Sequence, residues 1–241
     1  MTITPPSKLT ICTWNCNGAL RHKLGQIDSL DADILIIQEC EDPAQSQDAA
    51  YRTWAGENYA WIGTTASKGL GIFPRRNLAI EPLRWTHEAR FFLPRAVAGV
   101  PVCAVWAHRA TRKGRNYIGQ ISQALDSRAQ WLNDPACIFA GDFNSSAVWD
   151  GPRKSWGHTP TMQRLAALGL QSAYHRHYNV AHGDELHPSF FLQRNLAKPY
   201  HLDYILTGKA WQIGALRIGA PAEWLACSDH MPLMAELVRP G

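Results

Sequence analysis

Short apolar runs, separated by polar segments that contain glycine and proline, recur along the 241-residue chain. Apolar runs of this kind, bounded by turn-forming residues, are typical of buried β-strands. We therefore predict strands at residues 9–14, 33–38, 99–107, 137–140 and 200–206. Residues 60–102 contain shorter apolar pieces broken by glycine and proline, and this pattern predicts a meander of strands.

Three other segments carry apolar residues at helical spacing. In residues 20–30, leucine and isoleucine recur at intervals of four, three and three, which is one face of an amphipathic helix. Residues 118–132 repeat this pattern. We expect a third helix with Thr159 as its N-cap and Pro160 as its first residue, and we expect it to end at Gly169.

The alternation of strands and helices predicts an α/β protein whose helices lie outside the sheet layers. No repeat, low-complexity tract or long linker divides the chain, so we expect a single domain over residues 1–241. The composition is 46% hydrophobic and 18% charged, which permits a sizeable core and argues against global disorder.

The six cysteines form no CxxC pair and have no metal-ligand spacing. Cys12, Cys103 and Cys137 lie in apolar runs, which indicates buried thiols in a reducing compartment. The N-terminus lacks the apolar stretch of a signal peptide, and no run reaches the roughly eighteen apolar residues of a membrane span. We expect a cytoplasmic monomer that does not insert into membranes.

The formal net charge of +4 is small and does not by itself indicate a nucleic-acid partner. The distribution of charge is more informative, because four cations fall within seven residues directly after a predicted strand: Arg109, Arg112, Lys113 and Arg115. A solvated charged loop and a phosphate-binding segment both fit this cluster.

Polar side chains stand at the ends of most predicted strands: Asn15, Asn17, Gln38, Glu39, His108, Asp142, Asn144, Asp203, Asp229 and His230. Taken singly, several have a structural explanation, since Gly, Asp and Asn are common in turns. Glu39 is less easily explained, because a carboxylate directly after a buried run is costly unless it is paired or bound to metal. Six independent turns would not all need carboxylates, amides and imidazoles, so the set predicts an active site.

Five short motifs occur in a fixed order: WNCNG at 14–18, QE at 38–39, GDFN at 141–144, LDYIL at 202–206 and SDH at 228–230. In this order and spacing they resemble the endonuclease/exonuclease/phosphatase superfamily, and the resemblance spans nearly the whole chain. It implies a four-layer α/β sandwich of two packed mixed β-sheets flanked by helices. It also implies Mg²⁺- or Mn²⁺-dependent hydrolysis of phosphoesters at one end of the sandwich.

Phosphoester hydrolysis requires a positioned water, neutralisation of developing charge and assistance to the leaving oxygen. Glu39 is the strongest candidate for a Mg²⁺ ligand, with Asn15 beside it, and the resemblance adds Asp229. Asp142 and Asn144 are two residues apart, so in an extended segment their side chains point the same way. Asp142 would then activate water, and Asn144 would donate to a phosphate oxygen.

By resemblance, His230 would hold the negative charge of the phosphate and pair with Asp203. His108 occupies the position where pancreatic-type deoxyribonucleases carry histidine, so it would assist the leaving group. Abasic-site endonucleases commonly have tyrosine at this position, so the resemblance does not favour an activity specific for abasic sites. Arg109, Lys113 and Arg115 follow this strand end, where a phosphate backbone would have to run.

The sequence therefore predicts a divalent-metal phosphodiesterase whose substrate is nucleic acid. Two alternatives remain open at this point: a phosphatase or phosphodiesterase of a phospholipid head group or other small phosphoester, and a catalytically inactive binding module. The motifs of calcineurin-like phosphatases, HExxH metalloproteases and GxSxG hydrolases are absent.

Overall fold

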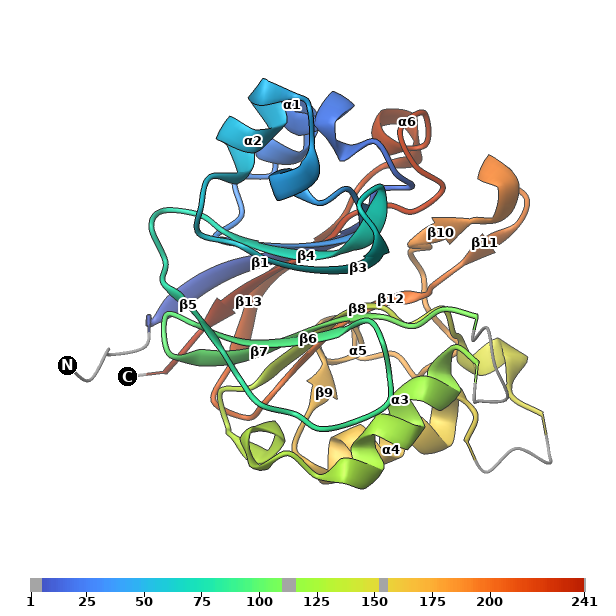
Figure 1. Cartoon of the computed structure of the whole chain (residues 1–241). Coiled ribbons are helices and arrows are strands. Elements are labelled where there is room, and N and C mark those ends of the chain that lie inside the picture. Colours follow the sequence, from blue (N-terminus) through green and yellow to red (C-terminus); the bar gives the residue numbers. More distant parts are fainter. Residues whose placement is uncertain (1–5, 110–115, 152–155, 241) are drawn as a thin grey trace.

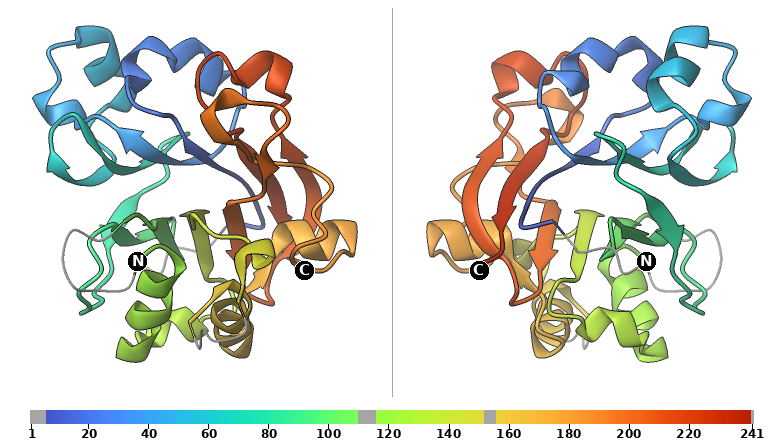
Figure 2. Two further views of the ribbon diagram at one scale, coloured as in Figure 1. Left: turned by 90° about the vertical axis from the view of Figure 1, so that its right-hand side faces the viewer. Right: turned by 90° about the vertical axis from the view of Figure 1, so that its left-hand side faces the viewer.

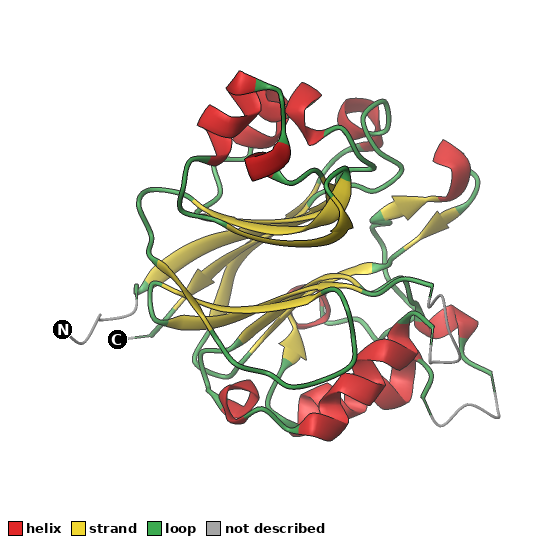
Figure 3. Cartoon of the chain, in the orientation of Figure 1, coloured by secondary structure: helices red, strands yellow, loops and turns green. Residues whose placement is uncertain are grey.

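A computed structural model describes residues 6–109, 116–151 and 156–240. Two six-stranded sheets lie face to face in this part of the chain, and helices cover their outer faces (Figures 1 and 3). The views in Figure 2 show helices above and below the paired sheets. The predicted four-layer α/β sandwich is confirmed.

The first sheet has the order β13-β14-β1-β2-β4-β3. Its strands are β13 (Gln212–Ile218), β14 (Leu233–Val238), β1 (Lys8–Asn15), β2 (Ile34–Cys40), β4 (Lys68–Pro74) and β3 (Ala60–Thr65). Only β1 and β2 run parallel among these described pairs, so the sheet is mixed, as predicted.

The second sheet has the order β5-β6-β7-β8-β12-β9. Its strands are β5 (Ile80–Pro82), β6 (Phe92–Val97), β7 (Val100–Trp106), β8 (Ile138–Asp142), β12 (Asp203–Thr207) and β9 (Gln171–Ser172). β7 and β8 are parallel, and the other described pairs are antiparallel. A separate hairpin consists of β10 (Phe190–Phe191) and β11 (Pro199–Tyr200).

The helices divide between the two outer faces (Figure 1). α1 (Leu24–Asp28), α2 (Ala49–Ala55) and α6 (Pro221–Trp224) lie over the first sheet. α3 (Ile118–Ala124) and α4 (His158–Ala167) lie over the second, and α5 (Ala173–Tyr178) packs against β12 and β13. No helix in the described ranges is long and apolar enough to cross a membrane.

Apolar side chains fill three layers. The layer between the sheets includes Ile36, Ile72, Val102 and Ile205. A second layer lies beneath α3 and α4, and a third beneath α1, α2 and α6. Of the six cysteines, Cys227 is half-buried and the others are buried, and all are free thiols, as predicted for Cys12, Cys103 and Cys137.

The predicted strands form, but the helices differ from prediction. The first is a 3₁₀ turn (Leu20–His22) followed by the short α1, and the second ends at Ala124 before two 3₁₀ turns. Left-handed Arg128 (φ 42°) interrupts it. α4 begins at His158 rather than Pro160, with Gly157 rather than Thr159 as its N-cap, because the Asp150 carboxylate accepts the N–H groups of His158 and Thr159 at 2.6 and 2.7 Å.

Strand register brings distant polar residues to one end of the sandwich. The parallel β1–β2 pair sets Asn15 opposite Gln38, so Glu39 comes next to the end of β1. In the other sheet the antiparallel β8–β12 pair sets Asp142 directly opposite Asp203. The polar ends of four strands therefore gather at one edge, where the chain of β10 also pairs with His230 through a single bridge at Phe190.

Gly141 permits the close approach that places Asp142. Its φ is 150°, and a Cβ at this position would lie 1.8 Å from the carbonyl oxygen of Val105 in the neighbouring β7. No side chain can occupy that space without moving the backbone of a central strand.

We expect Gly141→Ala to lower the free energy of unfolding by about 2–4 kcal/mol, through backbone strain and overpacking. Gly151→Ala is the matched control, because its added Cβ meets nothing within 4 Å. Denaturant unfolding of both variants measures the difference. Equal stabilities would contradict the requirement for glycine at 141.

Candidate active site

The end of the sandwich carries a buried group of two carboxylates and one imidazole. Asp142 is the last residue of β8, Asp203 is the first of β12, and His230 lies just before β14. One potential ligand atom from each of the three lies within 4.8 Å of the others. Both aspartates are 0% exposed and His230 is 4% exposed, so the group is shielded from water.

His230 and Asp203 form a hydrogen-bonded pair. The His230 Nδ1–H donates to Asp203 Oδ2 at 2.9 Å, and the same oxygen accepts from Ser189 Oγ at 2.7 Å. Burial opposes a charged imidazole, but the charges of Asp203 and Asp142 and this hydrogen bond raise the pKa of His230 to about 9. His230 is therefore an imidazolium near neutral pH, held in one orientation.

Asp142 is held by three amide donors. Its Oδ2 accepts from Asn15 Nδ2 at 3.1 Å and Asn144 Nδ2 at 2.8 Å, and its Oδ1 accepts the Asn144 backbone N–H at 2.8 Å. Oδ2 also lies 3.9 Å from His230 Nε2. Burial, together with the charge of Asp203, raises the pKa of Asp142 to about 7, although His230 and the hydrogen bonds oppose the shift.

Asn144 reaches Asp142 by a geometry different from the predicted one. The segment is not extended there, since β8 ends at Asp142 and Asn144 has a left-handed φ of 48°. The expectation of two parallel side chains on an extended strand is therefore wrong. The Asn144 amide donates to the Ala107 carbonyl at 2.9 Å and to Asp142, so in this state both amide hydrogens have acceptors.

Glu39 projects from a β-bulge. The register of β2 with β4 shifts between Gln38 and Cys40, and Glu39 has φ of 62°. Its carboxylate pairs with Lys68 Nζ at 2.5 Å and accepts from Asn15 Nδ2 at 3.4 Å. The expectation that this carboxylate must be paired or bound to metal is met by Lys68.

The oxygen-bearing side chains of Glu39, Asn15 and Asp142 meet at one point, because a single Asn15 amide nitrogen contacts both carboxylates. Carboxylate and amide oxygens are the ligands that Mg²⁺ prefers. The Asn15 oxygen currently accepts the Asn17 N–H at 3.1 Å. Glu39 and Asn15 fit as ligands of a hard divalent cation, and the Asp142 carboxylate lies beside them.

Asp229 is half-buried beside His230, and its negative charge contributes to the raised pKa of that histidine. Within the described ranges its carboxylate makes no hydrogen bond or ion pair, whereas its backbone oxygen accepts the Phe191 N–H at 2.8 Å. The structure thus places Asp229 next to the buried group but does not join it to Glu39.

His108 follows β7 and is adjacent to Ala107, whose carbonyl holds Asn144. Its Nδ1 lies 2.7 Å from the Arg109 oxygen, while its buried Nε2 has no hydrogen-bond partner among the described residues. Burial lowers the pKa of His108, so the ring is neutral with Nε2 as an acceptor. The Arg109 side chain is exposed, and Lys113 and Arg115 lie outside the described residues.

Sequence reasoning missed four residues that support this site. Ser189 donates to Asp203, Lys68 pairs with Glu39, and Trp14 Nε1 donates to the His230 carbonyl at 2.9 Å. Ser228 Oγ donates to the Asn15 carbonyl at 2.7 Å and accepts the His230 N–H. Two of the four carried a signal, because Trp14 opens the WNCNG motif and Ser228 opens the SDH triplet.

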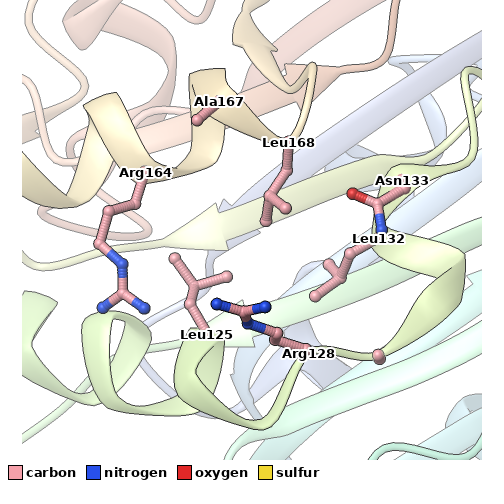
Figure 4. A pocket seen from close by; sticks show the side chains of 8 residues that line it. Leu125, Arg128, Leu132, Asn133, Arg164, Ala167 and Leu168 are labelled. Atoms are coloured by element: carbon pink, nitrogen blue, oxygen red, sulfur yellow. The ribbon is translucent and has the colours of Figure 1, made fainter.

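A hollow of about 360 Å³ lies elsewhere, among the helices over the second sheet. Leu125, Leu132 and Leu168 line it, flanked by Arg128 and Arg164 (Figure 4). Arg164 is already bonded to Ser122 and Asp126. None of the strand-end residues contributes to this hollow.

Several solved structures share the fold. The 3′-5′ exonuclease NExo from Neisseria meningitidis is 21% identical, with a TM-score of 0.67 over 95% of this chain and 100% of that one. A variant of the 3′ phosphatase NExo from Neisseria, bound to a product DNA hairpin, is 22% identical, with a TM-score of 0.70 over 95% and 99%. An AP endonuclease from Archaeoglobus fulgidus is 17% identical, with a TM-score of 0.62 over 94% and 98%.

No curated protein sequence matches the chain. A protein-family model does match, and it spans residues 12–230, from the middle of β1 to His230. This match covers all five motifs and both sheets, and it shows that the chain belongs to the Endonuclease/Exonuclease/phosphatase family.

Proposed function

We propose that the protein is a divalent-metal-dependent phosphodiesterase that acts on nucleic acid. The observation that carries the proposal is the buried Asp142–His230–Asp203 group beside the carboxylate of Glu39. Membership of a family named for nucleases and phosphatases supports phosphoester hydrolysis in general. We also expect one catalytic domain and a cytoplasmic monomer.

Glu39 and Asn15 would hold Mg²⁺ or Mn²⁺, with the Asn15 amide turned so that its oxygen faces the ion, and Asp229 would reach the same region or a second ion. When bound, such an ion neutralises phosphate oxygens and eases ionisation of water. His230 would donate from Nε2 to a phosphate oxygen, because Asp203 already accepts from Nδ1 and favours the charged ring. Asp203 is thus a positioning residue for His230.

Asp142 would accept a proton from the attacking water, since its Oδ2 lies beside His230 and Asn15 at the centre of the group. The Asn144 amide donates to Asp142, which it orients, and to the Ala107 carbonyl. To donate to a phosphate oxygen, it would have to give up one of these two hydrogen bonds. The Nε2 of neutral His108 has no partner in the described part of the chain and accepts a hydrogen bond rather than donating one. We therefore propose that His108 orients a hydroxyl group of the substrate or of the leaving group by accepting a hydrogen bond from it.

An aromatic path supports nucleic acid over small phosphoesters. Trp149 is 47% exposed, and its ring lies 4.9 Å from that of Tyr200. Tyr200 neighbours Phe190 at 6.4 Å, and Phe190 lies 4.6 Å from His230. One exposed and two half-buried aromatic rings leading to a phosphate-binding histidine are suited to stacking bases.

More specifically, we propose that the protein acts at the 3′ end of nucleic acid. Two solved structures with a similar fold are described as a 3′-5′ exonuclease and as a 3′ phosphatase, the latter bound to product DNA. The small-phosphoester phosphatase remains the alternative activity. A substrate panel separates these possibilities: DNA hairpins with 3′-hydroxyl or 3′-phosphate ends, RNA, bis-p-nitrophenyl phosphate and inositol phosphates.

With Mg²⁺ or Mn²⁺ present, we expect cleavage of DNA that stops in excess chelator and returns when the metal is restored. Asp142→Asn should reduce the rate by about 100- to 10,000-fold, because it removes the base but keeps the shape. Asp126→Asn is the control, since Asp126 pairs with Arg164 on the helical face. Full hydrolysis in chelator would refute metal dependence, and hydrolysis of inositol phosphates alone would favour the phosphatase.

Asp203→Ala and His230→Ala should be strongly non-additive, because one hydrogen bond joins them and they act on the substrate as a unit. We expect the double variant to lose little more kcat/KM than the worse single variant. Arg109→Ala combined with His230→Ala is the comparison, since no contact among the described residues joins Arg109 to this pair. A double variant whose loss equals the product of the single losses would show that they work independently.

Lys113→Ala with Arg115→Ala should weaken DNA binding and lower the slope of log K against log salt by about two, about one for each lost phosphate contact. Hydrolysis of bis-p-nitrophenyl phosphate should not change. Lys209→Ala with Arg217→Ala removes the same charge from exposed positions elsewhere, and so controls for net charge. An unchanged salt slope would exclude this segment from the nucleic-acid interface.

A further inference from the structure

A second group of titratable side chains lies on the flank of the second sheet, away from Glu39. His158 starts α4, His175 lies within α5, and His182 and Glu185 lie in the loop between α5 and β10. We call these four residues the histidine cluster. The proposed catalytic mechanism uses none of them.

The donor atoms of the cluster stand at the separations of metal ligands. One atom each from His175, His182 and Glu185 lies within 4.8 Å of the others. His175 Nε2 is 3.1 Å from Glu185 Oε1. Zinc–ligand bonds of about 2.0–2.1 Å in a tetrahedral site separate neighbouring ligand atoms by about 3.3 Å.

The opposite side of each donor is anchored, as ligands of a metal usually are. His175 Nδ1 lies 2.7 Å from Ser172 Oγ, and Glu185 Oε2 accepts the Gly183 N–H at 3.1 Å. His182 Nδ1 lies 3.1 Å from Nε2 of His158, whose own Nδ1 lies 3.1 Å from Ser145 Oγ. The rings of His175 and His182 are stacked with centroids 3.6 Å apart, so a turn of these rings is needed to direct both remaining nitrogens to one ion.

We propose that His175, His182 and Glu185 form a second metal site, for Zn²⁺ or a similar transition-metal ion, in which His158 holds His182 in place. Imidazole nitrogen suits such ions, whereas Mg²⁺ prefers oxygen ligands. Three protein ligands leave the fourth tetrahedral position to water. The ion would tie the loop of residues 179–189 to α5 and, through the contact of His158 with His182, to α4; that loop ends at Ser189, which holds Asp203.

The test uses the full chain with His230→Ala, which disables the other potential metal group, and excess Mg²⁺, which occupies oxygen-ligand sites. After chelator treatment and dialysis, Zn²⁺ is titrated calorimetrically, and bound zinc is counted by mass spectrometry of the metal. We expect one Zn²⁺ per chain and a higher Tm with zinc. The probe is the metal alone, so the result does not depend on nuclease activity.

In the same background, Glu185→Gln and His182→Ala should abolish zinc binding and the rise in Tm, and His158→Ala should weaken binding by about 10- to 100-fold. His177→Ala, an exposed histidine of the same helix, should bind zinc as the parent does. If His182→Ala fails to fold, the nearly isosteric Glu185→Gln decides. Absence of zinc binding by the parent, or unchanged binding by Glu185→Gln, overturns the proposal.

Discussion

Three ionisable groups are buried together at the end of the sandwich, and the attraction of one imidazolium for two carboxylates is the constraint on which the site depends. An unpaired buried charge costs several kcal/mol, so Asp142, Asp203 and His230 are tolerable only together. The pairing in turn requires that β8, β12 and the segment before β14 keep their relative positions. Ser189, Ser228 and Trp14 supply this by binding Asp203, Asn15 and the His230 backbone.

The two sheets contribute different parts of the chemistry. The first sheet carries Asn15 and Glu39, the oxygen donors nearest to solvent, and the second carries Asp142 and Asp203, which are fully buried. One amide, that of Asn15, bridges the sheets by donating to both Glu39 and Asp142. The face-to-face packing of the sheets therefore sets the distance between the cation ligands and the proton acceptor.

Sequence patterns predicted the strands and most of the site, because buried strands have strong apolar runs and the polar residues follow them at fixed places. They failed where tertiary contacts decide. Asp150 caps α4 from eight residues away, and left-handed Arg128 and Asn144 end an element where no glycine marks the turn. β13 was missed since most of its residues are exposed. Lys68 and Ser189 come from segments whose proximity to Glu39 and Asp203 only the fold determines.

The bulge in β2 separates two roles that the residues of a strand usually combine: packing in the hydrophobic layers and placing a functional side chain. Before it, Ile36 packs between the sheets, while Ile37 packs beneath the helices, and Cys40 after it returns to the same layer as Ile37. Glu39 is the extra residue in this alternation and belongs to neither layer. A substitution at position 39 should therefore alter the chemistry of the site while leaving both hydrophobic layers, and with them the stability of the fold, largely unchanged.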